Sequence, residues 1–407
     1  MVALSYKRAL AIIGFIALTI FFAVMLYLLF FRQPTTPITN EITGGPAGRL
    51  PPIGTGRPGT GPTGGPGGLP IGEEIEKEKP SKEANGGLTE ITPIISTLTD
   101  APTTDGQTVL YYQPTDGLFY RITPEGQVNK LSEQVFYNVS QVTWSPNRSA
   151  AVLEYPDGSN IVYNFQTKSQ VTLPKHWEEF SFSPDGNQLA FKSMGIDRDS
   201  RWLAVSNASG GDNEAIEPLG DNAKTVTVTW SPNRQIVALQ REVTGTDKQE
   251  IFFIGLQGEN FRSMTVPGLG LRSQWTPDGR SLLYSVSSPA NDYKPMLWIA
   301  GASGENIGAN RHSLGLNTWA DKCAFTDAAN VICAVPQELP AGAGLTPGIA
   351  ATIPDNLYSV NLNTGEKKLL AIPSTNITAE NVMVTSDKKW IFLKEALTGN
   401  LYKVALP

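Results

Sequence analysis

Cysteine and histidine are scarce in this chain, whose 407 residues include only two of each. Zinc sites are usually built from three or four such side chains, so the composition argues against a zinc centre and against a disulfide-rich scaffold. Charged residues make up 17%, below the roughly 25% of typical soluble proteins. The net charge of −6 supplies no basic surface for nucleic acid. We therefore expect no metal, no cofactor and no nucleic-acid partner.

Catalytic signatures are also missing. The chain contains no GxSxG nucleophile elbow, no HExxH, no Walker-type GxxxxGK and no CxxC motif. The one Gly-rich stretch, GPTGGPGG, has no predicted strand before it and no predicted helix after it, as a phosphate loop requires. The sequence therefore predicts no catalytic residue.

One long apolar segment is present, Ala9–Phe31, with 23 residues and no charge. As a helix it would span about 34 Å, enough to cross a hydrocarbon core of ~30 Å. Two basic residues precede it and one follows, a weak bias that places the N-terminus in the cytoplasm. A cleaved signal peptide would have a shorter apolar core and small residues at its cleavage site. We expect a cytoplasmic stub and signal-anchor helix in residues 1–32, with the rest outside the cytoplasm, in a periplasm or on the cell surface.

Residues 33–87 are predicted to form a flexible spacer. Twelve glycines lie between Gly44 and Gly72, and nine prolines lie between Pro34 and Pro70. The segment shows no apolar periodicity, so burial cannot offset the entropy of ordering it. We expect a partly extended linker, ending in the mixed charge run EEIEKEKPSKE.

Residues 88–407 repeat one pattern: an aromatic residue, Ser or Thr, Pro, Asn or Asp, then Gly or Arg. The copies begin at Trp144, Phe182, Trp230 and Trp275, at spacings of 38, 48 and 45 residues, and weaker copies begin at Pro102, Phe325 and Val384. Proline and Asx (Asn or Asp) residues favour tight turns, and apolar runs flank each copy, which is typical of β-hairpins. Periods of this size indicate a propeller or an array.

Each hairpin is followed by a second strand-like run, and seven such pairs occur. Seven blades of about 45 residues need ~315 residues, and the segment has 320. The last blade lacks an outer strand, which residues near Leu88–Ile91 could supply, closing the ring without open edges. We predict an all-β, seven-bladed β-propeller, with six or eight blades as alternatives.

The repeat resembles the WD40-like "PD40" repeat of TolB-type β-propellers. The residues that carry this resemblance are Ser145-Pro146-Asn147, Ser183-Pro184-Asp185-Gly186, Ser231-Pro232-Asn233 and Thr276-Pro277-Asp278-Gly279. It covers about three quarters of the chain. The resemblance implies the fold and says little about function, because the same repeat serves scaffolds, receptors and propeller halves of peptidases. Well-known members have six blades, so a count of seven departs from that pattern.

The two cysteines lie two residues before and eight residues after the start of a weak copy. In the stronger copies these two positions are mostly apolar, and we expect them to face each other across the hairpin. Cys323 and Cys333 would then be close enough for a disulfide, which an oxidising compartment would preserve. The alternative is two buried free thiols.

Binding in propellers usually uses the loops between blades and the loops that join second and third strands. Four of the latter are expected to be long, and the longest, Pro336–Asp355, is unusual inside a compact domain. Arginine and aromatic side chains often anchor partners. The candidate binding residues are Arg198, Arg201, Tyr293 and Trp298, together with the only histidines, His176 and His312. The histidines fall in blades that are not adjacent, so a shared metal is not expected, whereas the repeat aromatics should be packing residues.

The expected propeller carries a net charge of −8, a poor match for nucleic acid or anionic lipid. We expect a membrane-anchored, non-enzymatic scaffold that binds an envelope protein or glycan, with the membrane contact made by residues 9–31. Two alternatives are open. One is a propeller enzyme, lyase or hydrolase, or the regulatory partner of a separate peptidase, with clustered titratable groups at the channel mouth. The other is a sensor that binds a small ligand in the channel. The sequence leaves the oligomeric state open.

Overall fold

The structure of the protein, a computed structural model, describes residues 18–25 and 79–407. Most of the predicted membrane helix, Ala9–Phe31, and of the predicted spacer lies outside the described residues; residues 18–25 are helical, with exposed side chains. In the described parts of the chain, no helix combines the length and the apolar character needed to cross a bilayer. Residues 79–407 lie in one compact unit, described below.

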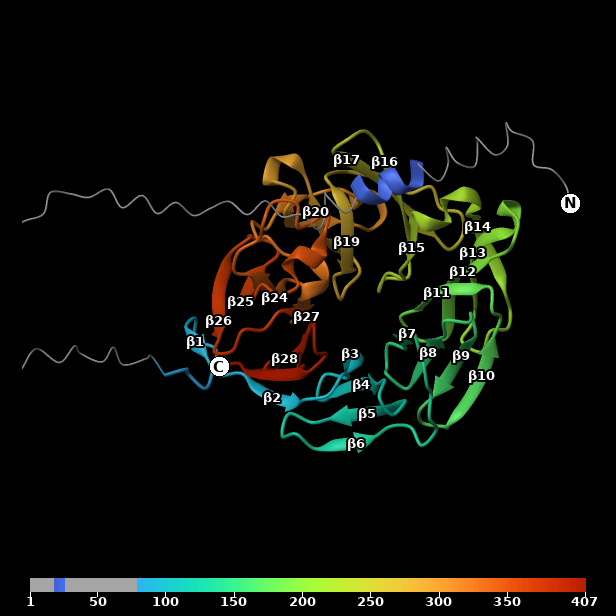
Figure 1. The fold of residues 1–407 in the computed structure, drawn as a ribbon. Coiled ribbons are helices and arrows are strands. Elements are labelled where there is room, and N and C mark those ends of the chain that lie inside the picture. The colour runs from blue at the N-terminus through green and yellow to red at the C-terminus, as the bar shows by residue number, and fades with distance from the viewer. Residues whose placement is uncertain (1–17, 26–78) are drawn as a thin grey trace, which may run out of the picture. The chain divides into compact units, whose positions relative to one another are not determined.

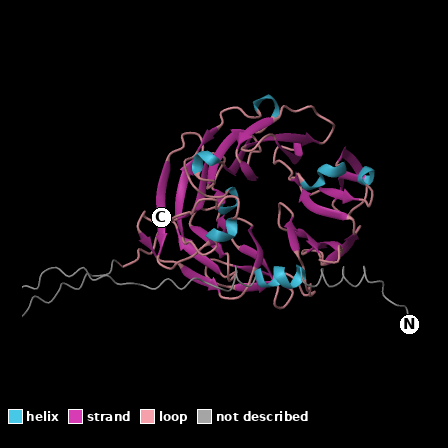
Figure 2. Ribbon diagram, turned by 45° about the horizontal axis from the view of Figure 1, so that its top comes forward, coloured by secondary structure: helices cyan, strands magenta, loops and turns pink. Residues whose placement is uncertain are grey.

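Seven antiparallel sheets form this unit, one for each predicted blade, arranged in a ring (Figures 1 and 2). We number the blades along the chain, and within each blade the first strand is the inner one. Blade 1 consists of β3 (Asp100–Thr104), β4 (Val109–Gln113), β5 (Leu118–Ile122) and β6 (Val128–Lys130). Blade 2 consists of β7 (Gln141–Trp144), β8 (Ala150–Glu154), β9 (Asn160–Asn164) and β10 (Ser169–Leu173). Blade 3 consists of β11 (Trp177–Phe182), β12 (Gln188–Met194), β13 (Arg201–Asn207) and β14 (Glu214–Pro218).

The second half of the ring repeats this arrangement. Blade 4 consists of β15 (Val226–Val228), β16 (Ile236–Val243), β17 (Lys248–Gly255) and β18 (Met264–Pro267). Blade 5 consists of β19 (Leu269–Trp275), β20 (Ser281–Ser287), β21 (Pro295–Gly301) and β22 (His312–Ser313). Blade 6 contains β23 (Cys323–Phe325), β24 (Asn330–Pro336), β25 (Asp355–Asn361) and β26 (Lys367–Pro373), and blade 7 contains β27 (Ala379–Val384), β28 (Trp390–Glu395) and β29 (Leu401–Ala405). Short 3-10 helices lie in the loops, namely η1 (Arg198–Ser200), η2 (Gly220–Lys224), η3 (Pro289–Asn291), η4 (Gly304–Asn306), η5 (Ala320–Lys322) and η6 (Pro347–Ala350).

The ring closes through the N-terminal end of the propeller. Strand β2 (Thr92–Ile95) pairs antiparallel with β29 and is the fourth strand of blade 7, so that blue and red strands share one sheet (Figure 1). We expected residues near Leu88–Ile91 to supply this strand, and the four residues that follow them form it. Instead, β1 (Leu88–Thr89) pairs in parallel with β26 of blade 6. The chain follows the outer edge of blade 6 before it crosses to blade 7, and Ile91 is buried at the crossing.

The propeller also begins earlier than predicted. Residues 79–87, assigned to the spacer from the sequence, contact blades 6 and 7. The amide of Ala84 donates to the carbonyl of Ala405 at 2.9 Å, and that of Gly86 donates to the carbonyl of Leu370 at 2.8 Å. Ala84 is 2% exposed, so this segment contributes to the core.

The core is divided among the seven interfaces between blades. Each of seven clusters of buried side chains joins two adjacent blades, including the pair formed by the first and the last blade. At that closing interface Tyr111 of blade 1 and Phe392 of blade 7 belong to one cluster and are 1% and 0% exposed. Stability therefore depends on contacts between neighbours around the ring.

The repeated turn is held together by its own side chains. In blade 2 the hydroxyl of Ser145 donates to Asn147 Oδ1 at 2.9 Å and accepts from the amide of Ala150 at 3.0 Å. Blades 3, 4, 5 and 7 repeat this arrangement with the same residue types. A hydroxyl that both donates and accepts explains why Ser or Thr precedes the proline in every good copy.

Cross-strand register differs from the prediction in most blades. We expected the residue eight positions after the start of each copy to face the residue two positions before that start. In blades 2, 3, 5 and 7 it faces the residue one position before the start instead, as Val152 faces Thr143. Cys323 and Cys333 are nevertheless directly opposite each other, because the turn of blade 6 is one residue shorter. They form a disulfide across β23 and β24, and within the described residues no cysteine is left free.

Removing this disulfide is expected to cost about 2–3 kcal/mol of unfolding free energy, because the bond closes a loop of only ten residues. Denaturant unfolding of Cys323→Ala/Cys333→Ala against the oxidised protein would measure the loss. Mass spectrometry of the protein purified without reductant should show a mass two hydrogens below that of the reduced chain. Two free thiols in the natively exported protein would contradict the prediction.

Candidate binding face

The two ends of the sheets differ in what they present. Because all strands within a blade are antiparallel, loops between blades and loops joining second to third strands emerge at one end. We call this end the loop face. The other end, the turn face, carries the Ser/Thr-containing turns and the loops that join third to fourth strands. The four loops predicted to be long are on the loop face and span residues 195–200, 244–247, 288–294 and 337–354.

The turn face is largely occupied by contacts that join neighbouring blades. The basic residue of a repeat turn reaches back to the turn of the preceding blade: Arg234 to Asp185 at 2.5 Å, and Lys388 to Asp327 at 2.8 Å. Arg148 donates to the carbonyl of Thr104 at 3.2 Å in the same way. These side chains are therefore already paired with groups of the neighbouring blade.

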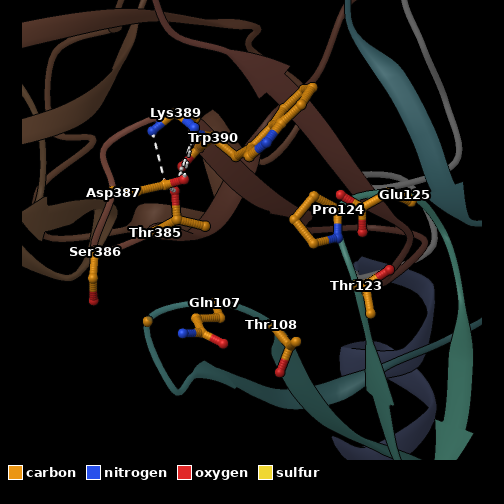
Figure 3. A pocket seen from close by; sticks show the side chains of 11 residues that line it. Gln107, Thr108, Thr123, Pro124, Glu125, Thr385, Ser386, Asp387, Lys389 and Trp390 are labelled. Atoms are coloured by element: carbon orange, nitrogen blue, oxygen red, sulfur yellow. Dashed lines mark hydrogen bonds and ion pairs between the residues drawn. The ribbon is translucent and has the colours of Figure 1, made fainter.

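A hollow of about 650 Å³ on the turn face lies where blades 1 and 7 meet (Figure 3). Gln107 and Thr108 line it from blade 1, and Asp387 and Lys389 line it from blade 7 (Figure 3). Its Asp387 already has partners within the protein, since it accepts from the Thr385 hydroxyl at 2.6 Å and from the Lys389 amide at 3.1 Å. The hollow is thus part of the seam that closes the ring.

The loop face carries most of the exposed large apolar side chains. Within residues 79–407 ten such side chains are exposed, and eight lie in loop-face loops or at a strand end beside one. Of the other two, Val128 begins the outer strand β6 beside a turn-face loop, and Val171 lies within the outer strand β10. The eight are Leu98, Val135, Tyr137, Ile196, Val243, Leu345, Ile349 and Leu397.

The predicted arginines lie on this face but differ in role. Arg198 in η1 is 69% exposed and makes a 3.5 Å ion pair with Asp221. The guanidinium of Arg201 donates to carbonyls of Gly195, Ile196 and Gly220, each at 3.4 Å. It thereby holds the loop that projects Ile196, whose side chain is 96% exposed.

The predicted aromatic anchors are less available. Trp298 lies within β21, where its ring stacks on Tyr284 with centroids 6.5 Å apart, so it packs within blade 5 and is not in a loop. The carbonyl of Tyr293 accepts from the amide of Gly344 at 2.9 Å. That bond joins the blade 5 loop to the long blade 6 loop, which has a small core of its own formed with Trp319.

The histidines are not brought together. His176 is exposed in the loop before blade 3, whereas His312 is in β22, the outer strand of blade 5. His312 Nδ1 lies 2.9 Å from the carbonyl of Asn310. The described residues contain no group of three or more His, Cys, Asp or Glu side chains placed to hold a metal.

A hollow that the sequence did not predict opens on the loop face of blade 2. Its volume is about 750 Å³. Two stretches line it, one from the loop between blades 1 and 2 and one from the loop between β8 and β9. We call it the tyrosine hollow; its lining residues are Tyr137, Asn138, Val139, Ser140, Tyr155, Pro156, Asp157 and Ser159. The sequence feature that could have indicated this hollow is the connection 131–140, whose ten residues are many for a loop between blades.

One buried ring positions the exposed tyrosine. Phe136 is 3% exposed and packs at 4.8 Å from the ring of Tyr163, whereas Tyr137 beside it is 62% exposed. The amide of Phe136 donates to the carbonyl of Gly117 at 2.7 Å, and its carbonyl accepts from the Tyr112 hydroxyl at 2.5 Å. Because both the amide and the carbonyl of Phe136 are hydrogen-bonded, the neighbouring Tyr137 is held in a defined position before any ligand binds.

Glu154, which directly precedes Tyr155 of the hollow, has a carboxyl group that faces blade 3, where one of its oxygens accepts from the amide of Glu179 at 3.3 Å. The amide and hydroxyl of Ser140 both donate to the carbonyl of Glu154 at 2.8 Å, and one carboxyl oxygen of Glu154 is buried without a hydrogen-bond partner. Burial raises the pKa of Glu154 to about 7, and the nearby carboxylates of Glu179 and Glu178 act in the same direction. Glu154 therefore titrates near neutral pH.

Replacing Glu154 by glutamine is expected to stabilise the protein more at pH 8 than at pH 5. The ordinary pKa is 4.5. As pH rises from there to about 7, the unfolded chain releases the proton while the folded protein holds it, so wild-type stability falls. A glutamine side chain does not titrate, so the stability of the variant does not fall in this way as pH rises. Urea unfolding of both proteins across that range would measure the difference, and a difference independent of pH would contradict the raised pKa.

Taken together, the fold and this face define a closed seven-bladed β-propeller with a one-sided, apolar and tyrosine-lined surface. No protein-family model and no curated protein sequence matches the chain. Among solved structures, the β-propeller domain of Cps50 (Swd1) from Myceliophteria thermophila has 12% identity and a TM-score of 0.50, with 78% of this chain and all of that one covered.

Two further solved structures have the same overall likeness. A chain of the mitotic checkpoint complex has 11% identity and a TM-score of 0.50, over 84% of this chain and 98% of that one. Oligogalacturonate lyase from Vibrio parahaemolyticus has 12% identity and a TM-score of 0.47, over 78% and 91%. At these identities the likeness to the two structures with a TM-score of 0.50 supports the propeller fold alone.

Proposed function

We propose that this protein is a non-enzymatic binding propeller that presents its loop face to a protein partner. The uneven distribution of exposed apolar side chains supports this proposal: eight of ten lie on the loop face, and one lies beside the turn face. Exposed apolar side chains that gather on one side of a soluble surface are typical of interaction sites. A rigid ring that holds them on loops suits binding without a large change of shape.

We further propose that residues 9–31 anchor this propeller in a membrane and that it lies outside the cytoplasm. The support is the run of 23 uncharged residues followed by a Gly- and Pro-rich spacer, which gives a tethered domain reach toward its partner. Protease added outside intact cells should digest the propeller but not a tag placed at the N-terminus. Protection of the propeller until the membrane is permeabilised would contradict this topology.

Site-specific photo-cross-linking in native membranes tests the binding face. A cross-linking amino acid at Ile196 or Leu397 should produce an adduct with a defined partner. The same amino acid at Val128 or Val171 should not, although these valines are also exposed. Ile196→Asp combined with Leu397→Asp should abolish adducts formed from a probe at Leu345. Equal yields from both sets of positions would refute the proposed face.

An enzyme is the second candidate, and Glu154 is the observation that favours it. A carboxyl group whose pKa is raised to about 7 by burial, with two further carboxyl groups nearby, is a common arrangement for acid–base catalysis. If Glu154 is catalytic, Glu154→Gln should abolish turnover of whichever polysaccharide or peptide substrate the wild-type protein cleaves, without loss of folding. A binding propeller would retain its partner in this variant and turn over no substrate.

A further inference from the structure

The tyrosine hollow has aromatic walls and a carboxylate but no basic lining. Tyr137 and Tyr155 come from its two sides, and Asp157 is the one charged residue among those that line it. Hydrogen bonds from the amide of Ser159 and from Lys175 lower the pKa of Asp157 to about 2. The hollow therefore contains a fixed negative charge at every physiological pH.

The partner of Asp157 is easily displaced. Lys175 pairs with it at 3.0 Å from outside the hollow, and the two side chains are 66% and 63% exposed. Exposed ion pairs of this kind contribute little free energy because water and salt screen them. An incoming cation with better geometry can replace Lys175 at small cost.

The loop face as a whole has more acidic than basic residues. Ten acidic and five basic residues lie in the loop-face loops, against ten and eight in the loops of the turn face. One of the five, Lys322, is buried in an ion pair. A partner surface with basic side chains among apolar ones would complement both the acidic residues and the exposed apolar side chains of this face.

We propose that the tyrosine hollow receives an arginine side chain of the protein partner, with the guanidinium against the tyrosine rings and paired with Asp157. This inference rests on the proposed function, since it names the chemistry of the partner that docks on the loop face. Guanidinium groups stack on aromatic rings and pair with carboxylates through two parallel hydrogen bonds. A neutral glycan would stack on the same rings but would gain nothing from the acidic surroundings.

The test uses two peptides that differ only in charge: acetyl-Gly-Leu-Arg-Leu-Gly-amide and its citrulline counterpart, titrated calorimetrically into the full-length protein in mild detergent. The arginine peptide should bind at least about tenfold more tightly than the citrulline peptide. Tyr137→Ala should weaken arginine-peptide binding by a similar factor, and Tyr137→Phe should retain it because the ring is kept. Asp157→Asn should weaken binding and reduce its dependence on salt.

Val171→Ala, a truncation of an exposed side chain on an outer strand, should leave binding unchanged. Equal affinity for the two peptides overturns the proposal, as does the absence of binding at millimolar concentration. Binding of a neutral oligosaccharide that is lost in Tyr137→Ala also overturns it and identifies a glycan site instead. Loop-face cross-links that persist in Tyr137→Ala with unchanged yield would refute the arginine pocket while leaving the proposed binding face intact.

Discussion

Replacing Lys322 by methionine is expected to lower the free energy of unfolding by about 3–5 kcal/mol. The ammonium group of Lys322 lies 2.7 Å from both carboxyl oxygens of Asp355, and the two residues are 6% and 2% exposed. Asp355 also accepts from the amide of Ala379 at 2.7 Å, so the pair links blade 6 to blade 7. Without the lysine, a buried carboxylate at this interface is left uncompensated.

The loss should depend on pH in a defined direction. Burial raises the pKa of Asp355, and the ammonium of Lys322 opposes that rise. In Lys322→Met the opposition is gone, so the folded protein holds the Asp355 proton to higher pH than the unfolded chain does. The destabilisation is therefore small in acid and increases as pH rises, which urea unfolding at several pH values would measure.

Two variants make this result specific. Lys322→Met combined with Asp355→Leu should recover most of the stability, because no buried charge remains. Lys388→Met is the matched control: its ion pair with Asp327 is 51% and 40% exposed, and its loss should cost less than about 1 kcal/mol. Similar losses in Lys322→Met and Lys388→Met would show that burial of the first pair does not matter.

Replacing Phe136 by alanine is expected to cost about 3–5 kcal/mol and to abolish binding at the tyrosine hollow. The ring is buried among Phe119, Tyr163 and other aromatic side chains, with centroid distances of 5.9 and 4.8 Å to these two. Its removal leaves a cavity and releases the loop that carries Tyr137. Denaturant unfolding and peptide titration on the same preparation would measure both effects.

The substitution Tyr137→Ala separates the effect on stability from the effect on binding. Tyr137 is 62% exposed, so Tyr137→Ala should change stability by less than about 0.5 kcal/mol while binding is lost. If Phe136→Ala is destabilised but binds as the wild type does, the loop does not need to be held in advance. If Tyr137→Ala is strongly destabilised, the exposed tyrosine has a structural role instead.

The fold could be predicted because its signals are local. The hydroxyl of Ser145 bonds to groups only two and five residues away, so the turn is encoded in a pentapeptide that recurs around the ring. The opposed cysteines were predicted from the same frame. The predicted register also holds in blade 4, where Val228 faces Ala238. It fails in blades 2, 3, 5 and 7, because turns one residue longer shift the pairing. Leu88–Thr89 pairs with blade 6 through a contact almost 300 residues distant in sequence.

The site was predicted only in outline. Three of the four predicted long loops were located from the sequence, and Arg198 lies on one of them. The fourth was wrong, because β16 and β17 extend until only residues 244–247 join them. Trp298 was misassigned because alternation along β21 turns its ring onto Tyr284. Tyr137 was missed because nothing local distinguishes an exposed tyrosine from a buried one; its exposure follows from Phe136, whose partners belong to other strands.

The amino-acid sequence by itself determined that this chain repeats a hairpin often enough to make a ring, because each turn is stabilised by atoms within a few residues of one another. Only the tertiary structure decided which end of the ring is apolar, where a hollow opens and which carboxyl group titrates near neutrality. These properties depend on burial and on charges contributed by adjacent blades, as Glu179 of blade 3 acts on Glu154 of blade 2. Such distances exist only after the sheets have packed against each other.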